Sequence, residues 1–453
     1  MRTGAQNETI RNMSLIKTGR RAFLGSASAG LIAAASDGFQ APPVTRPRAT
    51  AGDDVEPAWD ERLTVTVGHS RADIVGSDNR AIQAAVDYVA GLGGGVVRIL
   101  PGAYRFRNAV HLRSGVRIKG SGLDSILVKE ASAKTDLVAN SDWYEREITL
   151  ANPAGFEVGD GIVLRGRNPH NKGDEVRKAT LIARSGNRFK LDRMIDENFW
   201  LEGNSSAATL FALFDGFQIS DVSIEDVWLD GNRANNEFLN GNHIGCIFLR
   251  ESKGVTLRRV VARNFNGDGI SWQVAHDVRV VNCESVNNAG LGLHPGSGSQ
   301  RAVMVGNKVV GNDIGIFFCW GVRWSLAEKN TVSDTRRHGI SLGHSDTDNV
   351  VRGNRVARSG EIGIRLRQEH GPAFTPDRNR LEANEVLDSG GEAGIGIDIE
   401  GRTAAIALVR NVITESRGPA KRIGVRIGAE ARDISREGNR IEGVSVPVLD
   451  LRG

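Results

Sequence analysis

One short run of the chain places an imidazole beside two carboxylates. In the run GHSDTDN, residues 343–349, His344 is followed by Asp346 and Asp348. Side chains of these types predict one of three structures: an acid–base pair, oxygen ligands for Ca²⁺, or Asx turns. No other cofactor is indicated. The run is therefore a candidate catalytic segment, and Ca²⁺ binding stays open at this point.

A second run, one repeat later, carries cationic groups. In GIRLRQEH, residues 363–370, Arg365 and Arg367 alternate with apolar residues and Glu369 follows. A guanidinium group binds a carboxylate or sulfate through two parallel hydrogen bonds. The expected ligand is a uronic acid or a sulfated sugar, and therefore an acidic polysaccharide.

These runs belong to a repeat of about 24 residues, a period typical of solenoids. A glycine followed by an aliphatic residue recurs at Gly245, Gly269, Gly290, Gly315, Gly339 and Gly363. A second series of asparagines begins short β-type segments at Asn282, Asn307, Asn330, Asn354, Asn384, Asn411 and Asn439. Apolar and polar residues alternate within each repeat, which indicates strands. We expect Gly and Asn to take the positive φ angles of the corners.

The repeat is too short for a strand plus a crossover helix, so it predicts an all-β parallel β-helix. Leucine-rich repeats are the nearest alternative, but their L-x-x-L-x-L pattern is absent. Side chains of a strand alternate between two faces. With each repeat glycine counted as zero, positions 1 and 3 are apolar and predict the interior. Positions 2 and 4 point outward and include Ser271, Phe317, Ser341 and Arg365 at position 2, and Gln273, His294, Cys319 and Arg367 at position 4.

Polar and aromatic residues gather on this outward edge over five repeats. His276, Trp320, His344 and Glu369 follow the strands at the turn. We expect a cleft here, against the alternative of a solvated column of turns. The predicted catalytic residues are His344, Asp346, Asp348, Glu369, His294 and Asp268. The predicted substrate-binding residues are Arg365, Arg367, Trp320, His276 and Gln273.

Two resemblances support this fold. The segment AIQAAVDYVAGLGGGVVRILPGAYRF, residues 81–106, resembles the opening of the pectate lyase superfamily, whose members are right-handed β-helices acting on polysaccharides. NGDG (266–269), RHG (337–339) and RLR (365–367) are similar to the NTDG, GHG and RIK motifs of polygalacturonases. Their central Asp-Asp pair is missing here, and His294 lies where a carboxylate is needed. The resemblance therefore implies a role only for Asp268.

Several reactions remain compatible with these residues. A lyase needs a group that neutralises the uronate carboxylate, such as Arg365, Arg367 or Ca²⁺, and a base such as His344 or His294. A glycoside hydrolase needs two carboxylates. A C5-epimerase shares the proton abstraction of the lyase, and a non-catalytic carbohydrate-binding or structural solenoid needs none of these groups.

The N-terminal residues predict export. KTGRRAFLGSASAGLIAAA, residues 17–35, is similar to a twin-arginine signal, which places the protein in the periplasm or outside the cell. The expected organisation is a signal peptide (1–41), a Pro-rich linker (42–58), a cap with an N-terminal helix and the first coils (59–130), an inserted β module (131–212) and the main β-helix (213–453). The net charge of +4 and the lack of a basic run argue against a nucleic-acid partner. We expect a monomer without a membrane span.

Overall fold

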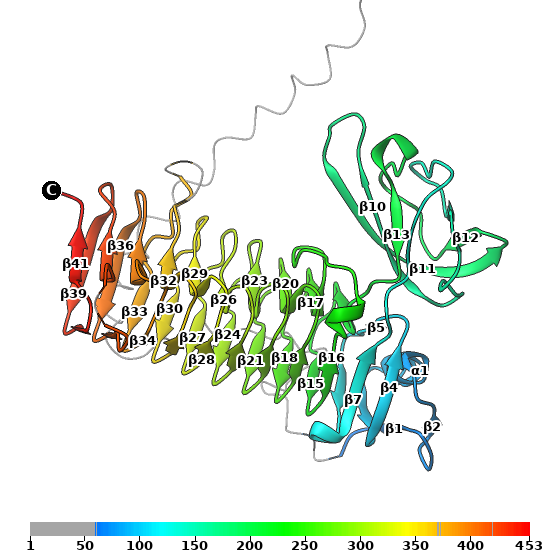
Figure 1. The fold of residues 1–453 in the computed structure, drawn as a ribbon. Coiled ribbons are helices and arrows are strands. Elements are labelled where there is room, and N and C mark those ends of the chain that lie inside the picture. Colours follow the sequence, from blue (N-terminus) through cyan, green and yellow to red (C-terminus); the bar gives the residue numbers. More distant parts are fainter. Residues whose placement is uncertain (1–58, 60, 369–370, 372, 419) are drawn as a thin grey trace, which may run out of the picture. The chain divides into compact units, whose positions relative to one another are not determined.

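The structure is a computed structural model that describes residues 59, 61–368, 371, 373–418 and 420–453. The predicted signal peptide and linker lie outside these residues. Three long sheets of parallel strands dominate the chain, and Figure 1 shows strands of successive coils, such as β17, β20 and β23, lying side by side. The prediction of an all-β parallel β-helix is confirmed. No helix among the described residues has the length and apolar character needed to cross a membrane.

Each coil contributes one strand to each of three sheets, here called A, B and C. Sheet A contains β2 (Ile74–Val75), β1 (Thr64–Gly68), β3 (Gly95–Ile99), β6 (Val116–Lys119), β15 (Ser223–Glu225), β18 (Thr256–Arg258), β21 (Arg279–Val281), β24 (Val303–Val305), β27 (Leu326–Glu328), β30 (Val350–Arg352), β33 (Arg380–Glu382), β36 (Ala404–Val409) and β39 (Arg432–Glu437). Sheet B contains β4 (Gly102–Phe106), β7 (Ser125–Lys129), β16 (Trp228–Asp230), β19 (Val261–Arg263), β22 (Glu284–Val286), β25 (Lys308–Val310), β28 (Thr331–Ser333), β31 (Arg355–Ala357), β34 (Glu385–Leu387), β37 (Val412–Thr414) and β40 (Arg440–Glu442). Sheet C contains β5 (Val110–His111), β14 (Phe214–Phe217), β17 (Gly245–Arg250), β20 (Asp268–Gln273), β23 (Leu293–Gly296), β26 (Ile316–Phe317), β29 (His338–Leu342), β32 (Ile362–Leu366), β35 (Ile395–Ile399), β38 (Ile423–Ile427) and β41 (Val446–Asp450).

The repeat glycines have a different role from the one expected. None of the six has a positive φ angle, and most lie inside or at the start of the strands of sheet C. A Cβ on Gly339 would lie 2.2 Å from Val356 Cγ1 and 2.6 Å from the carbonyl oxygen of Gly363. Gly315 is confined in the same way by Val332. These positions are glycine because the interior valines of sheet B leave no room for a side chain.

Six of the seven repeat asparagines, from Asn307 to Asn439, form a hydrogen-bonded ladder, whereas Asn282 is exposed and is the one of the seven with a positive φ angle. Asn330 is typical: its Nδ2 donates to the carbonyl oxygen of Met304 (2.9 Å) and to Asn354 Oδ1 (2.9 Å), and its Oδ1 accepts from the backbone N–H of Asn307 (3.0 Å). The amides therefore satisfy backbone groups that the turns would otherwise leave buried without partners. The prediction that Gly and Asn supply corner conformations is confirmed in part. Asn282 (φ 52°), Gly306 (φ 67°) and Gly353 (φ 62°) do so, whereas the ladder asparagines do not, and residues such as Asp334 (φ 56°) take other corners.

The first coil is covered by α1 (Asn79–Gly91). Asp78 caps this helix by accepting from the backbone N–H groups of Arg80 and Ala81, and Ile82, Ala85, Val86 and Val89 are buried. The expected N-terminal helix is thus confirmed. The described residues also contain short 3₁₀ helices, which are η1 (Gly122–Asp124), η2 (Leu201–Gly203) and η3 (Arg233–Asn235).

A separate antiparallel sheet interrupts the coils. It contains β8 (Lys134–Asp136), β13 (Ser206–Ala208), β10 (Gly161–Arg167), β11 (Asp174–Ser185), β12 (Arg188–Leu191) and β9 (Glu147–Thr149). This sheet has its own apolar cluster, which includes Leu164, Phe189 and Phe199. The stretch in which the sequence repeat is lost is therefore the stretch that pairs antiparallel.

Candidate functional site

The outward face of sheet C forms a continuous column of polar and aromatic side chains. Strand register aligns Ser271 (β20), His294 (β23), Phe317 (β26), Ser341 (β29), Arg365 (β32), Asp398 (β35) and Arg426 (β38). The sequence placed His294 two positions further along its strand. The difference arises because Gly292, not Gly290, packs against sheet B, where its Cβ would lie 2.3 Å from Val309 Cγ1.

His294 and Asp268 form a buried dyad in this column. His294 Nδ1 lies 2.7 Å from Asp268 Oδ2, and each residue is 2% exposed. The other oxygen of Asp268 accepts from the backbone N–H of Leu291 (2.8 Å). A carboxylate at this distance holds the proton on Nδ1, which makes Nε2 of the neutral ring a proton acceptor. His294 Nε2 is buried and has no hydrogen-bond partner among the described residues.

The dyad is covered by the loop between β16 and β17, residues 231–244. Gly241 is so close that a Cβ there would lie 1.6 Å from Asp268 Oδ2, and its carbonyl oxygen accepts from Ser271 Oγ (2.7 Å). Gln273, predicted to bind substrate, donates to Ser271 Oγ (3.3 Å) and is 4% exposed. The loop therefore shields the dyad from solvent in this conformation.

Phe317 contacts both the dyad and an arginine. Its ring lies edge-on to His294 with centroids 5.6 Å apart, and the guanidinium carbon of Arg367 lies 4.1 Å from its centroid. Arg367 also donates to Ser341 Oγ (2.8 Å) and to the carbonyl oxygen of Phe318 (3.0 Å). The predicted Arg367 and His294 thus share one aromatic neighbour, although 73 positions separate them in the sequence (367 − 294).

Asp346 lies beneath Arg367 and is fully buried. It accepts from the backbone N–H groups of Val322 (2.9 Å) and Gly343 (2.8 Å), and its Oδ2 is 3.7 Å from Arg367 Nη2. Burial raises the pKa of Asp346 to about 7, against the opposing effect of Arg367. Among the three alternatives for its run, this geometry is that of a turn.

Asp348 points elsewhere and is ion-paired with Arg378 (2.7 Å). Within the described part of the chain, no group of three or more His, Cys, Asp or Glu side chains is placed to hold a metal ion. The His, Cys, Asp and Glu side chains of these residues therefore do not form a ligand set for Ca²⁺.

Arg365 belongs to a charged network at the C-terminal end of the column. Its guanidinium pairs with both oxygens of Glu400 (3.1 Å each), and its Nη1 lies 2.9 Å from His338 Nε2. Burial, followed by the charge of Arg365, lowers the pKa of His338 to about 4, so the ring accepts this bond as a neutral imidazole. Burial also raises the pKa of Asp398, which pairs with Arg426, to about 6.

The predicted aromatic residue Trp320 lies at the turn that follows sheet C. Its ring is stacked on His344, with centroids 4.3 Å apart and planes at 9°, and His344 is stacked in turn on Phe374 at 4.4 Å. His276 lies at another corner, where its backbone pairs in parallel with that of Lys253 on one side and that of Gln300 on the other. Glu369 lies outside the described residues.

Sequence reasoning missed Asp398, Glu400 and Arg426 as members of this column. The signal was present, because GIDIE (396–400) and GVRIG (424–428) repeat the pattern of GIRLR one and two coils later.

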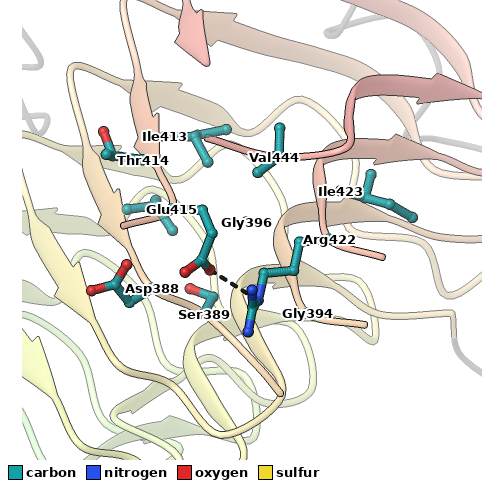
Figure 2. Close-up of a pocket in the computed structure, with 11 residues that line it drawn as sticks. Asp388, Ser389, Gly394, Gly396, Ile413, Thr414, Glu415, Arg422, Ile423 and Val444 are labelled. Atoms are coloured by element: carbon teal, nitrogen blue, oxygen red, sulfur yellow. Dashed lines mark ion pairs between the residues drawn. The ribbon is translucent and has the colours of Figure 1, made fainter. Parts of the chain in front are cut away.

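A small pocket lies at the turn between sheets B and C and is shown in Figure 2. It surrounds the buried ion pair Glu415–Arg422 (3.2 Å) and has room for no more than about one water molecule. None of the predicted site residues lines it.

Comparisons with known proteins agree with this architecture. A family model described as a right-handed beta helix region matches residues 201–323 and 245–413. No curated protein matches the chain in sequence.

Similar solved structures include the A-module of a mannuronan C-5 epimerase of Azotobacter vinelandii (15% identity, 82% of this chain and 94% of that one, TM-score 0.48). A surface adhesin of Streptococcus pneumoniae (13%, 82% and 89%, 0.47) and a tailspike of Pseudomonas phage phi297 (11%, 81% and 68%, 0.42) are also similar. At these identities the likeness concerns the fold alone. The chain is an all-β, right-handed parallel β-helix.

Proposed function

We propose that this chain is an exported lyase that cleaves an acidic polysaccharide on the outward face of sheet C. One observation carries the proposal: His294 Nδ1 is held by Asp268 at 2.7 Å, while the buried Nε2 has no hydrogen-bond partner among the described residues. Buried polar atoms are almost always paired, and the exceptions are frequently functional. The resemblance of the N-terminal coils to the pectate lyase superfamily supports the fold and a polysaccharide substrate, but it does not distinguish a lyase from a hydrolase.

In the proposed reaction His294 Nε2 removes the C5 proton of a uronic acid. The C4–O4 bond then breaks, a C4–C5 double bond forms, and the imidazolium returns its proton to the leaving O4. Asp268 stabilises the imidazolium between these two transfers, because its carboxylate accepts from Nδ1 throughout. The step needs no oxidant, no reductant and no second protein acid.

Arg367 supplies the positive charge that the reaction requires. Removal of the C5 proton places negative charge on the neighbouring carboxylate, and a guanidinium stabilises that charge. Arg367 and His294 both contact Phe317, which sets them on adjacent parts of one face. Arg365 is held more firmly by Glu400 and His338, so we assign it to a neighbouring sugar.

The alternative reactions need groups that this part of the face lacks. A hydrolase needs a second carboxylate near the bond that breaks. Asp268 is hydrogen-bonded to His294. Asp398 is four strands away from His294 in sheet C, or about 19 Å at the usual strand spacing. An epimerase needs an acid on the opposite side of the sugar, and among the described residues the dyad offers one proton-transfer group.

A purified sample incubated with a panel of polyuronides and sulfated glycans tests the reaction. We expect new reducing ends together with the ultraviolet absorbance of an unsaturated uronate. Reducing ends alone would indicate hydrolysis, and incorporation of solvent deuterium at C5 without cleavage would indicate epimerisation; either result contradicts the lyase.

A non-catalytic carbohydrate-binding protein is the second candidate. It is favoured by the burial of the dyad beneath residues 231–244, while the ring of Trp320 is 59% exposed. Binding to glycans without any chemical change in the panel would support it. For the lyase, the loop has to move aside when the polysaccharide binds.

A further inference from the structure

The aromatic residues at the turn after sheet C form a ladder across three coils. Trp320, His344 and Phe374 come from successive coils, and their ring centroids are 4.3 and 4.4 Å apart. This spacing is close to the distance between adjacent strands, so each ring occupies one level of the solenoid. Trp320 and Phe374 are 59% and 38% exposed, which places the ladder on the surface.

The ladder stops on the side of Trp320 that faces the N-terminal coils. Gly298 N donates to the carbonyl oxygen of Trp320 (2.7 Å), just as Gly321 N donates to that of His344 (2.8 Å). The level next to Trp320 is therefore formed by Ser297 and Gly298, which carry no ring. A Cβ added to Gly298 would meet no atom within 4 Å. One face of Trp320 thus borders an open level, while His344 covers the other.

The backbone of Trp320 has the conformation of a coil corner. Its φ angle is 64°, in the left-handed region, and Trp324 (φ 54°) and Asp334 (φ 56°) share it. The conformation therefore belongs to the coil, and the stacking and exposure of the indole carry the argument.

We infer that Trp320 is a stacking subsite for a pyranose ring, and that this ring occupies the open level above Ser297 and Gly298. The inference rests on the proposed function and names a second contact of the same substrate. The face of an indole carries partial negative charge and attracts the C–H groups of a sugar, which carry partial positive charge. A sugar bound in this way is recognised by its apolar face and not by its acidic group.

The open level belongs to the coil of His294. Strand β23 runs from Leu293 to Gly296 and leads directly into Ser297. Ser297 is three positions after His294, or about 10 Å along an extended chain. The stacked ring is therefore a neighbour of the reacting sugar in the same polysaccharide. The substrate must then span at least these two positions.

A printed array of acidic and neutral glycans, followed by calorimetry with the oligosaccharides that bind, tests the subsite. The parent is His294→Gln, so that the ligand is not consumed. We expect Trp320→Ala in this background to weaken binding about tenfold or more, and Trp320→Phe to keep most of the affinity. The matched control is Trp324→Ala, because Trp324 is also exposed (42%) and also has a positive φ angle (54°).

Equal affinity of Trp320→Ala and the parent would overturn the subsite, and so would an array on which the parent binds no glycan. The two proposals fail separately. Loss of binding in Trp320→Ala without any product from the wild-type protein would retain the subsite and reject the lyase. Full activity of His294→Gln would reject only the assigned base.

Discussion

Sheets B and C share one repeat but present different surfaces. On sheet B the outward column reads Trp228, Val261, Glu284, Lys308, Thr331, Arg355, Glu385, Val412 and Arg440. Lys308 and Glu284 form a typical pair at 3.1 Å, with side chains 57% and 41% exposed. On sheet C the corresponding side chains Ser271, His294, Ser341 and Asp398 are buried. Outward polar groups that are buried need specific partners, whereas those of sheet B are solvated.

This contrast in burial supports sheet C as the candidate functional face. The column of sheet B contains no histidine, whereas His294 Nε2 in the column of sheet C is buried and has no hydrogen-bond partner among the described residues. Such an atom carries a cost of roughly 1–3 kcal/mol. The cost is explained if a substrate supplies the partner.

The largest expected effect is on catalysis. Replacing His294 by Gln removes the base, and we expect the cleavage rate to fall about 10²–10⁴-fold. In Asp268→Asn the amide oxygen would keep the bond from the backbone N–H of Leu291, and the amide NH₂ would donate to Nδ1 and leave the ring proton on Nε2, so we expect a loss of similar size. Initial rates on the glycan cleaved by the wild-type protein measure both. His170→Gln, in the inserted sheet, is the control, and a wild-type rate in His294→Gln would remove the distinction between the two sheets.

The next effect concerns pH. The pKa of Asp346 is raised by burial to about 7 in the folded protein, so the native state holds a proton that the unfolded state releases. The contribution of Asp346 to the free energy of unfolding should therefore fall as the pH rises from about 4 to about 7, by an amount on the order of a few kcal/mol. The lowered pKa of His338 contributes in the opposite direction over much of this range. Urea unfolding at several pH values measures the slope.

Asp346→Asn should make this slope more positive than in the wild-type protein, because the group whose contribution falls with pH is gone. Asp334→Asn should leave the slope nearly unchanged, since Asp334 pairs with Arg358 at an exposed corner and its pKa is lowered chiefly by that hydrogen bond. Equal slopes for Asp346→Asn and the wild-type protein would show that Asp346 does not support the face as a buried acid.

A smaller effect is expected at the loop that covers the dyad. In Gly241→Ala the new methyl group would collide with the carboxylate of Asp268. We expect a loss of about 1–3 kcal/mol in unfolding free energy, with reduced activity because the carboxylate or the loop must shift. Gly391→Ala is the matched control, since a Cβ there meets no atom within 4 Å. Equal stability of the two variants would mean that residues 231–244 do not close over Asp268.

The smallest effect is expected on sheet B. Lys308→Gln breaks an exposed pair and should change the unfolding free energy by less than about 0.5 kcal/mol. Arg426→Gln, on sheet C, removes the partner of the buried Asp398 and should cost about 2 kcal/mol. Thermal or urea unfolding of both variants compares the two faces directly, and equal losses would argue against a difference in burial.

The sequence allowed the fold to be predicted because each repeat contains its own strand pattern. The interior residues Ile270, Ile340 and Leu366 followed from alternation alone. The register of His294 did not, because Gly290 and Gly292 both precede an aliphatic residue and only packing against Val309 distinguishes them. The contact of Gly241 with Asp268 was also beyond prediction, since the path of a 14-residue loop depends on tertiary contacts that no repeat specifies.

The most direct test of the dyad is the state of the His294 ring when ligand binds. Protein with ¹⁵N-labelled histidine gives separate signals for Nδ1 and Nε2, and His294→Gln identifies those of His294 among the nine histidines of the chain. We expect a proton on Nδ1, an unprotonated Nε2, and a shift of the Nε2 signal when an oligosaccharide of the cleaved glycan is added to a slowly reacting variant that keeps the dyad, such as Arg367→Gln. A saturating oligosaccharide that leaves the Nε2 signal unchanged would contradict the assignment of His294 as the base.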